Sequence, residues 1–146
     1  MPNQDEIALA KYRIEKAKDC LNASKLLLDD GLYADSGNRS YYAIFHSMNA
    51  LFALRSIGFK KHSGVLSNFN LDYIKSGLIE IEYAKIAKEA FSVRTQSDYS
   101  DFYIISKQEV SEQYDNAVKF VNRIEEYIKI QILLSDYTKL KNDINK

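Results

Sequence analysis

The amino-acid sequence predicts an all-α protein, a single domain spanning residues 1–146 and folded as a bundle of four to five helices. The chain contains one proline and five glycines among 146 residues, so long stretches are free of helix breakers. Apolar residues recur at three- and four-residue steps over several segments, which is the period of an amphipathic helix. Two of these segments open on the pattern of a capping box, a sequence signature of helix N-termini.

The first helix is expected over Gln4–Asp30. Asn3 followed by Glu6 predicts the capping box at its start, and Gly31 is placed to cap its C-terminus. Alternating three- and four-residue steps define its buried face, formed by Ile7, Ala10, Ile14, Ala17, Leu21, Ser24 and Leu28.

Three further helices are expected in the middle of the chain, and the breaks between them fall at glycines. Gly58 ends the first of these helices, and Gly77 caps the second. A basic loop, Phe59–Gly64, separates these two helices, and Ser63 is placed to cap the one that follows. The three helices are expected over Asp35–Ile57, Val65–Lys75 and Leu78–Val93.

The last helix is expected to follow a loop over Thr95–Ser106, which is rich in serine, aspartate and tyrosine. Ser106 and Glu109 form the second capping-box pattern. Helical spacing of apolar residues then extends the helix to about Tyr137, before a polar tail from about residue 138.

Composition excludes several classes of function. Twenty basic and twenty acidic residues give a formal charge of zero, which argues against a generally basic nucleic-acid binder but leaves room for a local patch. The single cysteine, Cys20, forms no internal disulfide and indicates a reducing compartment. One cysteine and two histidines cannot complete a closed zinc site without carboxylates or a second chain, so we expect no metal and no cofactor.

The chain is expected to be cytoplasmic and to make no contact with a membrane. Its N-terminus is charged and lacks the apolar run of a signal peptide. The longest charge-free stretch, Ser40–Leu54, is too short to span a bilayer.

The helix expected over Asp35–Ile57 carries the residues best suited to chemistry. Arg39 and His46 are seven residues apart, which corresponds to about 10.5 Å along the axis and about 20° around it. They therefore share a face, and both side chains could serve one phosphate. Small residues surround them on this face: Ser36, Ala43, Ala50 and Ala53.

The alanines on this face indicate a helix–helix contact. Between Arg39 and Arg55 the helix has no charged residue, whereas a solvated face normally carries lysine and glutamate. Small residues at heptad-like spacing let another backbone approach closely. We expect the approaching helix to be that of a second copy across a two-fold axis, giving a homodimer. A structural alternative stays open, in which His46 is a packed histidine and Arg39 pairs with an acidic neighbour.

The segment Asn38–His46 (NRSYYAIFH) resembles the hallmark segment of HEPN-domain proteins, in which four to six residues separate an arginine from a histidine. Lys61–Val65 with Phe69 is similar to the family's next block, and Arg94–Tyr99 is similar to the block after its fourth helix. The resemblance runs in order from the first helix to the last.

This resemblance implies a helical bundle that dimerises through the motif helix, with Arg39 as the motif arginine and His46 as the motif histidine. Many members are metal-independent endoribonucleases, often toxins paired with a minimal nucleotidyltransferase antitoxin, and others act in RNA-based defence. Some members serve as nucleotide- or partner-binding modules. The chain departs from the family at Ser40, where active members often have asparagine, aspartate or histidine, and at Met48, where some toxins have a tyrosine that their antitoxin nucleotidylates.

Cleavage of RNA without a metal needs a base for the ribose 2′-hydroxyl and a cation for the charge on the phosphorane. His46 suits the role of the base, and Arg39 suits that of the cation. Lys60, Lys61 and Arg94 are further candidates for phosphate contacts. Each of these candidates has a structural alternative. Lys60 and Lys61 could belong to a solvated turn, and Arg94 could form ion pairs with Asp98 and Asp101.

Three functions remain open from the sequence. The first is a metal-independent ribonuclease in a toxin–antitoxin or defence system. The second is a non-catalytic module that binds nucleotide or substrate and partners a nucleotidyltransferase. The third is a structural helical adaptor.

Overall fold

A computed structural model describes residues 1–99 and 104–146 and confirms the all-α class. Every regular element among these residues is helical. A π-helical turn, η1, directly continues the third α-helix. The elements in chain order are α1 (Gln4–Asp29), α2 (Tyr33–Ala53), α3 (His62–Phe69), η1 (Asn70–Ile74), α4 (Ile81–Tyr99) and α5 (Lys107–Ile144).

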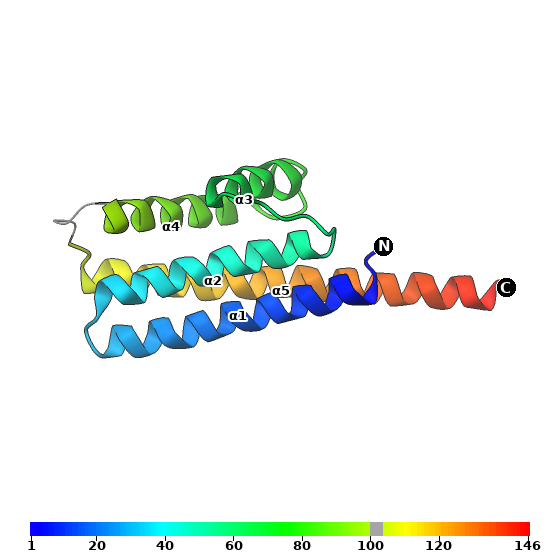
Figure 1. The fold of residues 1–146 in the computed structure, drawn as a ribbon, viewed down its shortest axis with the longest axis horizontal. Coiled ribbons are helices and arrows are strands. Elements are labelled where there is room, and N and C mark those ends of the chain that lie inside the picture. The colour runs from blue at the N-terminus through cyan, green and yellow to red at the C-terminus, as the bar shows by residue number, and fades with distance from the viewer. Residues whose placement is uncertain (100–103) are drawn as a thin grey trace.

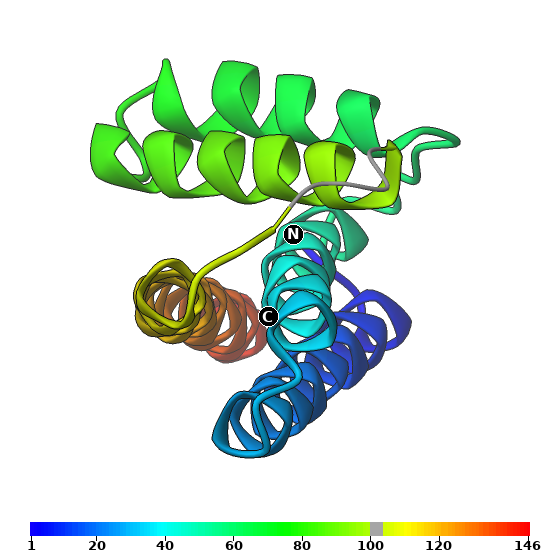
Figure 2. The same ribbon diagram turned by 90° about the vertical axis from the view of Figure 1, so that its left-hand side faces the viewer.

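The long helices α1, α2 and α5 run side by side, and α3 and α4 lie across one side of them (Figures 1 and 2). Helix α2 occupies the centre of this arrangement, since it packs against α1, α4 and α5. The side chains of Tyr41, Leu51 and Phe52 on α2 and of Phe120 and Ile124 on α5 are almost completely buried in the core. The distal part of α5 projects beyond the other helices (Figure 1).

Small residues at every seventh position join α1 to α2. Ser24 on α1 and Ser36 on α2 are fully buried, and their hydroxyl oxygens lie 3.0 Å apart. The Ser24 hydroxyl also lies 2.7 Å from that of Ser40. Because the two helices are antiparallel, this contact places Ala17 opposite Ala43, and Ala10 opposite Ala50. All four alanines have no exposed surface, so the two backbones approach closely.

The alanine-rich face of α2 is therefore covered by α1 of the same chain. Our expectation that this face meets a second copy is wrong for Ala43, Ala50 and Ala53, which are buried within one protomer. The spacing correctly indicated a close helix partner. The partner is the helix that precedes α2 in the sequence.

Several helix boundaries differ from those expected around α3. Helix α2 ends at Ala53, four residues before Ile57, and Ser56 then adopts a positive φ of 53°. Helix α3 begins at His62, so the basic loop is shorter than expected. The N-cap residue of α3 is Lys61, whose side chain makes no capping hydrogen bond. Our prediction that Ser63 caps this helix is therefore wrong.

The two last helices are longer than expected. The segment Thr95–Tyr99 belongs to α4, because the Thr95 hydroxyl donates to the Phe91 carbonyl and an i,i+4 ion pair joins Arg94 to Asp98. Ser106 caps α5 as expected, since its hydroxyl accepts from the Glu109 N–H at 3.1 Å. The tail expected from about residue 138 is instead helical as far as Ile144.

The capping box at Asn3 and Glu6 is present, and Gly31 adopts the positive φ expected after α1. Among the described residues, no helix combines the length and apolarity that crossing a bilayer requires.

The close contact between α1 and α2 predicts that Ala50→Leu destabilises the protein. The added side chain has no room between the backbones, and overpacking of this kind costs about 1–3 kcal/mol. Chemical denaturation measures the free energy of unfolding. Ala8→Leu, at an exposed position of α1, is the control and should change it by less than about 0.5 kcal/mol. Equal effects of the two substitutions would contradict the proposed packing.

Candidate functional site

The structure places Arg39 and His46 on two sides of Tyr42, at one edge of the α1–α2 contact. The Arg39 guanidinium carbon lies 5.0 Å from the centroid of the Tyr42 ring. The Tyr42 and His46 ring centroids are 5.9 Å apart. All three side chains are half-buried. Their three- and four-residue spacing keeps them on one strip of the helix surface, so the two motif side chains are accessible from the same side.

Helix α1 adds positive charge to this strip. Arg13 donates from Nη1 to the Asn49 carbonyl of α2 at 3.0 Å, which fixes it beside the C-terminal half of that helix. Lys16, one turn along α1, is exposed and close enough to act electrostatically on His46. We refer to Arg13, Lys16, Arg39 and His46 as the cationic strip.

The pKa of His46 is lowered to about 4 from its ordinary value of 6.5, and burial is the largest cause. The positive charges of Lys16, Arg39 and Arg13, followed by His62, contribute to the same shift. His46 is therefore neutral at neutral pH, the form in which an imidazole accepts a proton. Between pH 6.5 and about 4 the unfolded chain binds more protons at this site. The stabilising contribution of neutral His46 is thus present above pH 6.5 and declines as the pH falls toward 4.

Arg39 is held by a neutral partner. Its Nη2 donates to Oδ1 of Asn38 at 2.8 Å. Within residues 1–99 and 104–146, no carboxylate oxygen lies within ion-pair distance of Arg39. The alternative in which Arg39 pairs with an acidic neighbour therefore finds no support in the described part of the chain.

Cys20 lies beside Arg39 on the α1 side. Its side chain is buried, and burial raises the pKa of the thiol, while the positive charge of Arg39 opposes this shift. The thiol is consequently protonated at neutral pH.

The second histidine, His62, is the first residue of α3, and its ring packs against aromatic side chains of α2. Its ring stacks on Phe45 with centroids 4.0 Å apart, and its Nδ1 lies 2.7 Å from the Tyr41 hydroxyl. Burial raises the pKa of Tyr41 to about 12, so this phenol keeps its proton. Burial, followed by the charge of Arg94, lowers the pKa of His62. We therefore assign the Tyr41 hydroxyl as the donor and place the His62 proton on Nε2.

The three other candidates for phosphate contacts lie near this histidine. The Arg94 guanidinium carbon is 5.5 Å from the Tyr41 ring, and Arg94 Nε is 2.9 Å from an Asp98 carboxylate oxygen without hydrogen-bond alignment. The ion pair expected within this segment is thus present for Asp98, whereas Asp101 lies outside the described residues. Lys60 and Lys61 are exposed directly before His62. Their role in phosphate binding stays a prediction.

The two positions at which the chain departs from the HEPN pattern that it resembles point away from the strip. Ser40 is fully buried and contacts Ser24 of α1. Met48 is buried in the core. Neither side chain is accessible to a substrate at the cationic strip.

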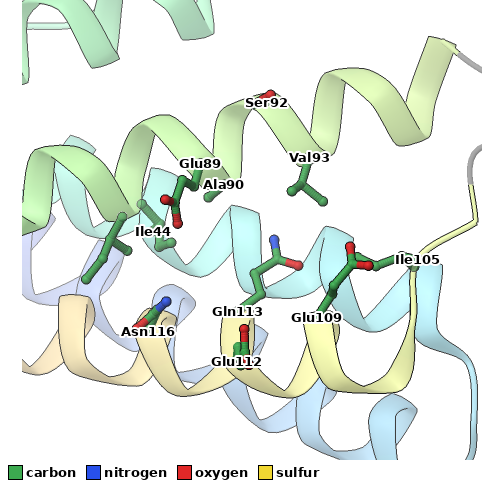
Figure 3. Close-up of a pocket in the computed structure, with 11 residues that line it drawn as sticks. Ile44, Glu89, Ala90, Ser92, Val93, Ile105, Glu109, Glu112, Gln113 and Asn116 are labelled. Carbon is green, nitrogen blue, oxygen red and sulfur yellow. The ribbon is translucent and has the colours of Figure 1, made fainter.

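A separate cavity of about 270 Å³ lies between α4 and α5 (Figure 3). Glu89, Glu109 and Glu112 line it together with Gln113, whose side chain donates to the Gly37 carbonyl of α2 at 3.3 Å. Three carboxylates would repel a phosphate, so this cavity does not extend the cationic strip. No trio of histidine, cysteine or acidic side chains in the described ranges is arranged to hold a metal ion.

Sequence reasoning missed Arg13, Lys16 and Tyr42. Tyr42 could have been found, because it stands three residues after Arg39 and four before His46. Arg13 and Lys16 lie on one flank of α1, three residues apart, but their link to His46 depends on how α1 packs on α2.

The family model described as the HEPN domain matches residues 10–130. A Thermotoga maritima protein named "UPF0332 protein" is 32% identical over 121 residues, covering 83% of this chain and 92% of the relative. A Methanocaldococcus jannaschii protein named "Putative toxin MJ0605" is 37% identical over 116 residues, covering 80% of this chain and 86% of the relative.

Two solved structures share the fold. TT1696 from Thermus thermophilus superposes with a TM-score of 0.68 at 21% identity, covering 81% of this chain and 97% of that one. ST0689, described as an archaeal HEPN homologue, superposes with a TM-score of 0.63 at 16% identity, covering 82% of this chain and 97% of that one.

The charges around His46 predict its titration. We expect its Cε1 proton resonance to report a pKa of about 4 in the folded protein, because burial and three cations disfavour the imidazolium. Inorganic phosphate should raise this pKa, since a bound anion offsets the positive charges. Proton NMR between pH 3 and 8 makes the measurement, with His46→Gln assigning the signal. A pKa of 6.5 or above without added anion would contradict this electrostatic environment.

Proposed function

Since this chain belongs to the HEPN-domain family, we propose that it is a metal-independent endoribonuclease acting as a toxin of a toxin–antitoxin or defence system. One observation carries the proposal. A neutral histidine and an arginine without a carboxylate partner in the described chain share a half-exposed strip with two further cations.

The proposed reaction uses the 2′-hydroxyl of RNA as its nucleophile. Neutral His46 accepts the proton of this hydroxyl while the oxygen attacks the adjacent phosphorus. Arg39 pairs with the phosphorane oxygens and retains its own proton throughout. Arg13 and Lys16 add positive charge around the same phosphate. The products are a 2′,3′-cyclic phosphate and a 5′-hydroxyl end, so DNA, which lacks the nucleophile, is not a substrate.

The leaving 5′-oxygen needs a proton donor, and we propose that a second copy supplies it. In a homodimer that brings two cationic strips together, His46 of the partner subunit is the candidate acid. This role requires the bound phosphate to offset the nearby positive charges, so that the pKa of this imidazole rises and it carries a proton. The half-exposed side chains of Tyr42 and Phe45 leave apolar surface beside the strip for such a contact. The alanine face of α2 is not available to it, because α1 covers that face.

Two relatives carry names that begin "Putative toxin", which supports the biological setting that we propose. In this setting the proposed antitoxin is a minimal nucleotidyltransferase, and the proposed substrate is cytoplasmic RNA. The antitoxin would not act on the position two residues after His46, because that position is the buried Met48.

The second candidate function is a non-catalytic module that binds nucleotide and partners a nucleotidyltransferase. The burial of Ser40 favours it, because the residue after the motif arginine is turned toward α1 and gives the strip no polar group. This candidate keeps phosphate binding at the cationic strip and lacks cleavage.

The nuclease proposal predicts that the purified protein cleaves single-stranded RNA in EDTA. Arg39→Ala and His46→Ala should each lower the rate by about 100-fold or more, since one removes charge stabilisation and the other the base. The readout is the rate of cleavage and the presence of cyclic phosphate ends.

Lys88→Ala removes an exposed cation on α4 and is the matched control, which should cleave like the wild type. Undiminished cleavage by the His46→Ala variant would refute the mechanism. If the wild type binds RNA without cutting it, the binding module is the better description.

The predicted role of Lys60 and Lys61 is tested separately. Lys60→Ala/Lys61→Ala should weaken RNA binding and reduce its salt dependence, because each lysine that contacts a phosphate releases counterions. Fluorescence anisotropy at several salt concentrations gives the slope. An unchanged slope would assign both lysines to a solvated turn.

A further inference from the structure

The distal part of α5 carries an apolar stripe that faces solvent. Beyond the region matched by the family model, the helix continues to Ile144 and leaves the bundle (Figure 1). Between 46% and 74% of each apolar side chain in the stripe is exposed. These side chains belong to Ile130, Leu133, Tyr137, Leu140 and Ile144.

The stripe has the spacing of a coiled-coil seam. Its five residues alternate between three- and four-residue steps, which places isoleucine, tyrosine and isoleucine at the a positions and leucine at both d positions. Leu134, an e-position neighbour with 51% of its surface exposed, widens the seam. We refer to these six residues as the α5 seam.

The α5 seam points away from the bundle. Ile124 and Ile128 are buried against the core, and Tyr137 lies nine residues beyond Ile128, which is half a turn around the helix. None of the seam residues belongs to the hydrophobic core of the described chain. Another helix can therefore approach the seam without displacing α1 or α2.

We propose that the α5 seam pairs with the seam of a second copy of this chain as a parallel, two-stranded coiled coil. Isoleucine at a with leucine at d is the combination that favours two parallel strands, and the seam has it at two of its three a positions and at both d positions. The fold already nucleates the helix upstream, so this short seam does not bear the cost of starting a helix.

Charge complementarity favours the parallel orientation. Asp136 occupies a g position and Lys141 the following e position. In a parallel pair, each Asp136 faces the partner's Lys141, which gives two attractive contacts related by symmetry. In an antiparallel pair, g faces g and e faces e, so like charges meet instead.

The proposed pairing of two α5 seams uses a different helix from the cationic strip and does not depend on the proposed nuclease function. It buries the outward face of α5, whereas the strip lies along α1 and α2. A copy paired through the seam therefore keeps its strip open to substrate.

The first test is the molar mass of the full chain in solution, measured by sedimentation equilibrium over a range of concentrations. Leu133→Asp/Leu140→Asp should halve the mass of the assembly, because two charges in each copy are brought into the seam. Asn142→Asp/Asn145→Asp adds the same charge outside the seam and should leave the mass unchanged. Circular dichroism checks that both variants keep their helix content. A mass that is insensitive to the seam substitutions would overturn the proposal.

Orientation and register are tested by cross-linking and charge exchange. With Cys20→Ser, Ile144→Cys should form a disulfide-linked dimer under mild oxidation, since the two positions face each other only in a parallel pair. Asn142→Cys, on the far side of the helix, should not form this disulfide.

The charge-exchange test uses the pair Asp136 and Lys141. Asp136→Lys should weaken the pairing by about tenfold, and Lys141→Asp in the same chain should restore it. Cross-linking by neither cysteine variant, or no rescue by the exchange, would overturn the parallel arrangement.

Discussion

The close approach of α1 and α2 determines the geometry of the candidate site. Buried serines and alanines at every seventh position allow the two backbones to pack tightly, and hydroxyl contacts among Ser24, Ser36 and Ser40 fix the register between them. This register places Arg13 and Lys16 of α1 beside His46 of α2. A shift by one helical turn would separate the cations from the imidazole, so the electrostatic environment of His46 depends on buried side chains outside the strip.

The environment of His46 combines burial with positive charge, and both lower its pKa. Such a site is unfavourable for an imidazolium until an anion enters. A phosphate would reverse the electrostatic part of this balance, so the binding of an anion beside His46 would raise its proton affinity. The aromatic cluster around His62 holds the neighbouring surface, since stacking on Phe45 and the hydrogen bond to Tyr41 leave its ring little freedom.

The sequence was sufficient for the fold class and for the shared placement of Arg39 and His46, because both follow from helical periodicity. It was not sufficient for the partner of the alanine face, because small residues indicate that a helix approaches but not which helix. The cations of α1 were missed for the same reason, since their contact with α2 spans more than 30 residues of sequence. The end of α4 was misplaced because serine, threonine and aspartate favour loops, whereas here Thr95 bonds to the helix backbone and Asp98 pairs with Arg94.

The position of Cys20 has a practical consequence. Its thiol is protonated and buried next to the motif arginine, with 8% of the residue exposed. Local separation of α1 from α2 would expose the sulfur further and speed its alkylation, so the rate of modification reports on how often the two helices part. The chain thus contains its own probe of breathing motions at the edge of the site, and no foreign label needs to be introduced.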